Sequence, residues 1–338
     1  MKIRQIASVA AMMLTTCLLT TVSARAQAPV TIRIGYLHSE LLDVPFIHGL
    51  QSGYFKDRGI DLQMVKFDNG TQINQALAGG SLEAAVAGAG VVENYAVQGN
   101  GVVIAPAYID DNELYADPAQ GVKKVADLAG KQVAFPLGTT ANVLVYWAAE
   151  DAGIGYKAVK PVNMGYTQTA AGLLSGAVPS AVTFGAFSRL INREKPTFVK
   201  IATLKTFFPK RVVFGGLVTS NEYRKANRNA LVRLAAAYIK SYSEIWTTEP
   251  ARRKVWEAAY AKDESYEDFK RNLVDLPTPP SVEEWVKYLD DGSVAKWAID
   301  VGETLKSVGA MKTIGDPKDF LDIALYKEAY AMTQSSKK

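Results

Sequence analysis

Short apolar runs separated by amphipathic stretches fill the chain as far as residue 218, which is the pattern of alternating strands and helices in an α/β protein. Beyond Tyr223 the apolar positions follow helical spacing almost continuously to Tyr330. We therefore expect an α/β protein with a helical carboxyl-terminal part. The runs that predict strands are 31–36, 61–67, 84–87, 102–108, 131–135, 159–163, 181–183 and 211–218.

One pattern occurs twice: a short helix ends at a glycine and leads into a strand of small residues. The two copies are residues 67–90 and 166–186, offset by 96 positions. Alanine, glycine and valine are common enough for such a match to arise by chance, but the preceding helix ends, 55–60 and 149–154, repeat as well. Two βαβ units with equivalent loops favour two lobes that face each other across a binding cleft.

The amino terminus has the pattern of a secretory signal peptide. Lys2 and Arg4 precede an apolar run at 6–22, and a small-residue site ending at Ala26 follows. We expect cleavage after Ala26 and export to the periplasm; a membrane anchor is the alternative. The single cysteine, Cys17, lies inside this run, so the mature chain would contain no thiol and no disulfide.

Charge and size after cleavage narrow the class of protein. Removing residues 1–26 takes away three basic residues and no acid, so the formal net charge falls from +4 to +1. This argues against a nucleic-acid or membrane-surface role. The remaining 312 of 338 residues exceed what one core usually supports. We expect one lobe from 27–108 with 216–338, and a second lobe from 109–215.

Candidate binding loops lie where the strands of each lobe end, because ligands of open α/β sheets gather at the carboxyl ends of strands. Gly88, Ala89 and Gly90 offer free amides before a helix, although such a pair of glycines is also a common tight turn. Thr139 and Thr140 precede another helix, where a hydroxyl can cap the helix and also hold a bound anion.

Aromatic residues near these loops have two interpretations. Phe184 and Phe187 follow a predicted strand and belong either to the core or to an apolar wall of the cleft. Phe214 lies in the strand at 211–218, whose central glycine pair suits a second crossing between the lobes.

Enzyme chemistry finds little support. The histidines, His38 and His48, are ten residues apart and have no partner at metal-ligand spacing. A hydrogen-bonding role suits His38 better than a catalytic base. The acidic run Asp110, Asp111 and Glu113 is expected to be a solvated turn. The chain contains neither a G-x-S-x-G motif nor a P-loop.

Taken in order, several short segments resemble the periplasmic substrate-binding proteins of ABC importers in the nitrate, sulfonate and taurine group, which also includes proteins for thiamine precursors. Each segment alone is unspecific, but the series covers nearly all of the mature chain. The segments are 33–36, 53–60, 67–70, 76–86 and 127–136.

The resemblance implies a type II-like periplasmic binding protein. Two α/β lobes joined by two crossing strands would close around one small solute and hand it to an ABC permease and its ATPase. It implies a monomer with no cofactor and no metal. The family's pocket loops fall on His38, Ser39, Asn69, Ala89, Thr139, Thr140 and Phe184. Gly90 and Phe214 complete the set of candidate binding residues.

The expected solute is a small organic anion, with taurine or another sulfonate first. Ala89 stands where sulfonate binders often carry a hydroxyl residue, and none of the loops 37–43, 88–91, 138–142 and 184–187 contains an arginine. Amides and hydroxyls would hold the anion, which favours an organic acid with an apolar body. For an ammonium on the solute, Glu40 or Asp43 could supply a counter-charge, although a surface role suits each better.

Other functions in the same fold stay open. The solute could be an aromatic carboxylate, nitrate or a thiamine precursor, and the protein could serve a sensory receptor. An enzyme of the thiamine-pyrimidine synthase type is disfavoured, because the cysteine-rich iron motif of those enzymes is absent.

Overall fold

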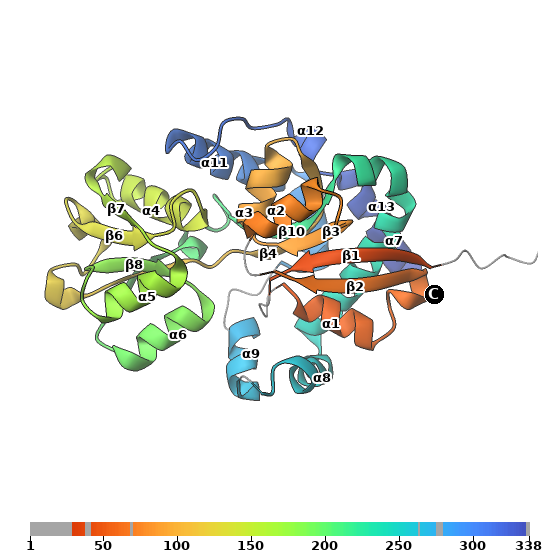
Figure 1. The fold of residues 1–338 in the computed structure, drawn as a ribbon, viewed down its shortest axis with the longest axis horizontal. Helices are drawn as coiled ribbons and strands as arrows, with labels where there is room; N and C mark the ends of the chain where they lie inside the picture. Colours follow the sequence, from red (N-terminus) through yellow and green to blue (C-terminus); the bar gives the residue numbers. More distant parts are fainter. Residues whose placement is uncertain (1–28, 38–41, 68–69, 263, 275–279, 336–338) are drawn as a thin grey trace, which may run out of the picture.

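The chain folds around two five-stranded sheets, one in each of two lobes (Figure 1). The computed structural model describes residues 29–37, 42–67, 70–262, 264–274 and 280–335. The order of strands is β2-β1-β3-β10-β4 in the first sheet and β7-β6-β8-β5-β9 in the second.

The first sheet combines strands from both ends of the chain. β1 pairs in parallel with β2 and β3, whereas β10 runs antiparallel between β3 and β4. Its strands are β1 (Val30–Tyr36), β2 (Ile60–Lys66), β3 (Ala84–Ala87), β4 (Gly101–Ile109) and β10 (Phe214–Ser220). The helices that follow its parallel strands are α1 (Val44–Gln51), α2 (Gly70–Ala78) and α3 (Ala89–Val91), the last continuing as a π-helical turn at Val92–Val97.

The second sheet is built on the same plan. β6 pairs in parallel with β7 and β8, and β5 runs antiparallel between β8 and β9. Its strands are β5 (Glu113–Ala116), β6 (Gln132–Phe135), β7 (Lys160–Asn163), β8 (Ser180–Thr183) and β9 (Val199–Thr203). Its helices are α4 (Thr140–Asp151), α5 (Tyr166–Leu174) and α6 (Gly185–Glu194).

The internal repeat is confirmed element by element. An offset of 96 carries α2 at 70–78 onto α5 at 166–174, and β3 at 84–87 onto β8 at 180–183. The same offset carries the start of α3 at Ala89 onto the start of α6 at Gly185. Gly80 and Gly176, which close the two helices, have positive φ angles of 70° and 77°, a backbone conformation that favours glycine.

The carboxyl-terminal part is helical, as expected, and covers the first sheet. α7 packs against α1 and α13, while α11 reaches across to the second lobe, where Trp147 Nε1 donates to Thr304 Oγ1 at 2.9 Å. These helices are α7 (Asn221–Thr247), α8 (Glu249–Ala259), α9 (Tyr266–Val274), α10 (Val282–Asp290), α11 (Ser293–Ser307), α12 (Pro317–Phe320) and α13 (Ile323–Ser335).

The structure corrects three helix boundaries that the sequence pattern predicts. Apolar spacing predicts one helix at 317–330, but the segment is split, because Leu321 bridges to Val103 at the edge of β4 and Asp322 N donates to Val103 O at 3.0 Å. The pattern at 45–58 predicts one helix with its stop at Gly59, but α1 ends at Gln51 and a separate 3₁₀ turn at Lys56–Arg58 leads to Gly59. The turn residues at 68–70 predict Thr71 as the cap of the next helix, but α2 begins at Gly70, so Thr71 lies inside the helix.

Two connections join the lobes. The first runs from the end of β4 through residues 110–112 to β5, and the second runs from the end of β9 through a 3₁₀ turn at Leu204–Phe207 to β10. The connections touch each other, because Asp110 N donates to Val213 O at 2.7 Å next to the pair Phe214–Ile109. Both crossings therefore lie side by side as a single junction.

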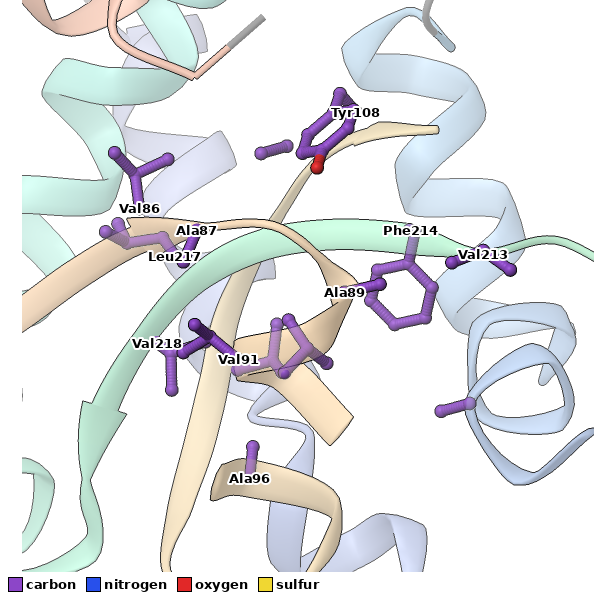
Figure 2. Packing of buried hydrophobic residues seen from close by; sticks show 14 of the residues in the cluster. Val86, Ala87, Ala89, Val91, Ala96, Tyr108, Val213, Phe214, Leu217 and Val218 are labelled. Carbon is purple, nitrogen blue, oxygen red and sulfur yellow. The ribbon is translucent and has the colours of Figure 1, made fainter. Parts of the chain in front are cut away.

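Tyr108 explains the glycine pair near the start of β10. A β-carbon at Gly215 would lie 2.1 Å from Cε1 of Tyr108 and 2.7 Å from the carbonyl oxygen of Ala87. The Tyr108 hydroxyl lies against the next loop, 2.8 Å from where Gly88 would carry a β-carbon. Figure 2 shows Tyr108 toward the end of its strand. Close packing against Tyr108 and the carbonyl of Ala87, and not only a bend in the strand, therefore requires glycine at position 215.

Gly215→Ala is expected to lower the free energy of unfolding by roughly 1–3 kcal/mol, because the added methyl group must displace the Tyr108 ring or the β3 backbone. Urea unfolding of the two proteins measures this change. Gly90→Ala is the control, since a β-carbon there has no atom within 4 Å. Equal stability of the Gly215→Ala variant and the wild type would contradict the packing described here.

Candidate functional site

The loops at the carboxyl ends of β3 and β6 present helix starts. In the turn that opens α3, Val91 N and Val92 N donate to Gly88 O at 2.9 and 3.3 Å, so the amides of Ala89 and Gly90 precede the first hydrogen-bonded turn. Ala89 is fully buried, and Gly90 borders open space. Gly90 therefore leaves room beside its amide for a second molecule.

The two threonines at the start of α4 have different tasks. Thr139 Oγ1 donates to Pro136 O at 2.7 Å and accepts from Ala141 N at 3.3 Å, which confirms the expected helix cap. Thr140 is buried, and its hydroxyl oxygen accepts from Asn112 Nδ2 at 2.8 Å. The Thr139 hydroxyl is thus used within its own turn, while Thr140 points toward the crossing between the lobes.

Asn112 connects a set of polar side chains that we call the crossing network: Asp110, Asn112 and Thr140, which are buried, and Tyr166, which is partly buried. Its Nδ2 donates to Asp110 Oδ1 at 2.7 Å as well as to Thr140, and its Oδ1 accepts from the Tyr166 hydroxyl at 2.9 Å. The network joins the first crossing to the starts of α4 and α5.

The expectation that the acidic run is a solvated turn was wrong. Asp110, Asn112 and Glu113 are each at most 9% exposed. Two of the three carboxylates in the run have cationic partners, since Asp111 Oδ2 lies 3.0 Å from Lys205 Nζ and Glu113 pairs with Lys200. Among the described residues Asp110 has no such partner, and its hydrogen bonds come from neutral groups, the backbone and side chain of Asn112 and the hydroxyl of Thr140.

Burial and the neighbouring carboxylate of Asp111 raise the pKa of Asp110 to about 6, against the opposing hydrogen bonds from Thr140 and Asn112. Burial also raises the pKa of the Tyr108 hydroxyl, with further contributions from Asp110 and Tyr166. Tyr108 stands on β4 of the first lobe and Tyr166 on α5 of the second, so both lobes contribute to the surroundings of this carboxyl.

Aromatic rings continue from the crossing network to the protein surface. The Tyr166 ring meets that of Phe184 edge to face, with centroids 4.6 Å apart, and Phe187 follows at 5.9 Å. Phe184 is 40% exposed, so it is not a core residue. Phe214 is 1% exposed, packs on Trp285 with centroids 6.4 Å apart, and lies within the apolar packing of the first lobe (Figure 2).

The remaining candidates divide into two groups. His38, Ser39, Asn69 and Glu40 lie outside the described residues. Asp43 was expected at the surface, but it is fully buried and accepts a hydrogen bond from the Tyr260 hydroxyl.

Two further points, on His48 and on groups of metal-ligating side chains, concern the described residues. His48 is buried, with Nε2 2.8 Å from Glu244 Oε2 on α7, which indicates a structural role. The part of the chain that the structure describes holds no group of three or more metal-ligating side chains.

A cavity of about 780 Å³ lies elsewhere, between α4 and the end of α11, and is lined by residues such as Leu137, Tyr146 and Ala310. Its polar groups already bond one another, since Asn142 Nδ2 donates to the Tyr156 hydroxyl at 2.9 Å and Tyr156 N donates to Glu150 Oε1 at 2.8 Å. We therefore place the candidate site at the crossing network, where among the described residues Asp110 has no cationic partner and the ring of Phe184 is 40% exposed.

Sequence reasoning missed Tyr108, Asn112 and Tyr166. Tyr108 ends an apolar strand and Tyr166 starts a repeated helix, so each lies near a strand end, where binding loops were expected. Neither tyrosine belongs to a motif, and the sequence marks them only by their positions next to predicted loops.

Comparison with known proteins identifies the family. Residues 43–251 match the family model described as NMT1/THI5 like. The chain belongs to this family. Over 293 residues it is 26% identical to a candidate binding protein of Brucella abortus (strain 2308), covering 86% of this chain and 90% of the relative.

Solved structures show that the NMT1/THI5-like chain has the two-lobed fold of periplasmic binding proteins. A periplasmic sulfonate-binding protein of Methylobacillus flagellatus KT superposes with a TM-score of 0.73 at 18% identity, over 90% of this chain and 95% of that one. The aliphatic sulphonate binding protein of Escherichia coli superposes with a TM-score of 0.67 at 15% identity, over 86% of this chain and 92% of that one. The nitrate-binding protein of Synechocystis PCC 6803 superposes with a TM-score of 0.63 at 14% identity, over 90% of this chain and 89% of that one.

The family match and these neighbours confirm the expected resemblance and fold class. In the described part of the chain, no helix combines the length and apolar character needed to cross a membrane.

Asp110→Asn is expected to stabilise the ligand-free protein at pH 7.5. Because the pKa of Asp110 near 6 exceeds the value of about 3.9 in an unfolded chain, the folded state binds more protons between roughly pH 4 and 6. The free energy of unfolding of the wild type therefore falls as the pH rises through this window. The variant avoids this loss, so we expect it to gain roughly 1–3 kcal/mol at pH 7.5 and almost nothing at pH 4.

Urea unfolding at several pH values measures the difference between wild type and variant. Asp127→Asn is the control, because hydrogen bonds from the Lys123 and Lys124 amides lower the pKa of Asp127 and its removal should act in the opposite direction. If the difference in the free energy of unfolding between Asp110→Asn and the wild type does not change with pH, the raised pKa of Asp110 is not its cause.

Proposed function

We propose that this protein is a periplasmic solute-binding protein that captures a small organic anion, with taurine or another sulfonate first, and delivers it to an ABC permease. Solute would bind between the lobes, shift the population toward a closed form, and present that form to the permease. A signal peptide cleaved after Ala26 would export the chain, and a monomer needs no cofactor for this task.

The crossing network is the observation that carries the proposal. It brings a buried carboxylate, an amide and two hydroxyls to the junction of the two sheets, beside the starts of α4 and α5. Tyr108 extends it to the loop after β3 on the other lobe. A solute that contacts both lobes here would gain more from the closed form than from the open one, which is what closure requires.

Several features favour an organic solute over a small inorganic ion. Phe184 exposes part of its ring beside Tyr166, which suits an apolar body. The amides of Ala89 and Gly90 and the start of α4 would hold the acidic group, since helix starts attract anions. His38, Ser39 and Asn69 stay proposed contacts from the first lobe, whereas Phe214 would support the loop from beneath.

A thermal-shift screen of residues 27–338 tests the solute class, with taurine, alkane and aryl sulfonates, nitrate, aromatic carboxylates and thiamine precursors as probes. A ligand at a hundred times its dissociation constant should stabilise the folded state by about 2.7 kcal/mol. We expect a sulfonate to give the largest shift.

The same measurement with an excess of sodium sulfate is the control, because it shows how much a salt alone stabilises the protein. A larger shift with a thiamine precursor, an aromatic carboxylate or nitrate would replace the sulfonate assignment, and no shift with any probe would contradict it.

A further inference from the structure

The environment of Asp110 is unfavourable for a charged carboxylate. It is 9% exposed and has no cationic partner among the described residues, whereas the adjacent Asp111 and Glu113 pair with Lys205 and Lys200. Asn112 donates twice to Oδ1 and Thr140 adds a hydrogen bond, but these donors are neutral and leave the negative charge of Asp110 uncompensated. Burying an unpaired carboxylate costs stability, so its presence at a binding junction calls for a partner that arrives with the solute.

The surroundings of Asp110 specify the chemistry of that partner. Its near neighbours are the hydroxyls of Thr140, Tyr166 and Tyr108, and the aromatic chain continues from Tyr166 to the exposed Phe184. A carboxylate beside aromatic rings is a suitable environment for a cationic nitrogen, which gains both a charge-assisted hydrogen bond and a contact with the ring faces.

We propose that Asp110 is the counter-charge for a positively charged nitrogen on the solute, so that the protein selects zwitterions, such as amino sulfonates or amino carboxylates, over plain anions. This inference rests on the proposed binding function and names the solute class within it. It assigns the counter-charge to a residue in the crossing between the lobes, and not to Glu40 or Asp43.

A plain anion fits this site poorly. The carboxylate of Asp110 would repel a sulfonate in the same partly buried junction, and the lysines nearest in the chain are already paired with Asp111 and Glu113. In a zwitterion, the ammonium would neutralise Asp110, and the acidic group would reach the amides of Ala89 and Gly90 on the first lobe. The two ends of one molecule would thereby contact the crossing and the first lobe.

Matched solutes test the proposal. Isothermal titration compares taurine with isethionate and ethanesulfonate, which replace the ammonium by a hydroxyl group and a hydrogen atom, and compares β-alanine with propionate, which also carries a hydrogen atom in place of the ammonium. In the wild type, the ammonium compound of at least one set should bind ten-fold or more tightly than its counterparts without the ammonium. Asp110→Asn should weaken binding of that compound at least ten-fold and leave the counterparts equal or improved.

The control variant is Asp111→Asn, which removes the same charge one residue further along, where the carboxylate faces Lys205. Its affinity for the ammonium compound should stay within about three-fold of the wild type. Circular dichroism and thermal unfolding establish that both variants are folded.

The outcomes separate this proposal from the proposed function. If ethanesulfonate binds the wild type as tightly as taurine, or Asp110→Asn leaves taurine binding within two-fold, the counter-charge role is refuted while a sulfonate binder remains. If none of these compounds binds, the sulfonate assignment fails, and a library of amines matched to hydroxyl and methyl analogues is screened on both proteins. Hits confined to amines and lost in Asp110→Asn support the role of Asp110; a tightest hit without positive charge, or no hit, overturns it.

Discussion

The structure depends on the contact between the two chain crossings. β4 leaves the first lobe and β10 returns to it as antiparallel neighbours, and the hydrogen bond from Asp110 N to Val213 O continues this pairing past the end of the sheet. Both connections are therefore held at one junction, and the lobes can move about it without separating. The constraint also decides which side chains meet, because residues just beyond β4 must lie between the sheets. Asp110 and Asn112 occupy these positions, so the proposed binding site lies at the crossing because of the topology.

The repeat gives the two lobes equivalent loops, but the lobes complete their sheets differently. In the first lobe the antiparallel strand β10 is the returning crossing, and in the second lobe the antiparallel strand β5 is the arriving one. Each sheet thus receives a crossing strand next to its repeated strand, β3 or β8. α11 adds a third connection through Trp147 and Thr304, away from the crossing network. Movement of the lobes is then restricted on the α11 side, which favours opening and closing of the opposite side as a hinge.

Local pattern was sufficient to predict much of this fold. Glycine stops and small-residue strands identified both copies of the repeat, and the apolar spacing identified most of the helices. What failed depended on distant partners. The split between α12 and α13 arises because Leu321 pairs with Val103, which no local pattern encodes. The acidic run at 110–113 has the composition of a solvated turn, and only the packing of the two lobes buries it. Among the candidate binding residues, Thr139 was correctly expected to cap its helix, whereas Tyr108 and Tyr166 carry no motif and become visible only when strand ends from both lobes are placed together.

The central claim is that solute bound at the crossing network draws the two lobes together. Small-angle X-ray scattering of the protein, with and without a saturating amount of the solute that gives the largest thermal shift, tests it most directly. The account predicts a smaller radius of gyration and a shorter maximum dimension in the bound state, with a smaller change in the Asp110→Asn variant at the same solute concentration. Identical scattering profiles for the free and fully bound wild type would contradict it.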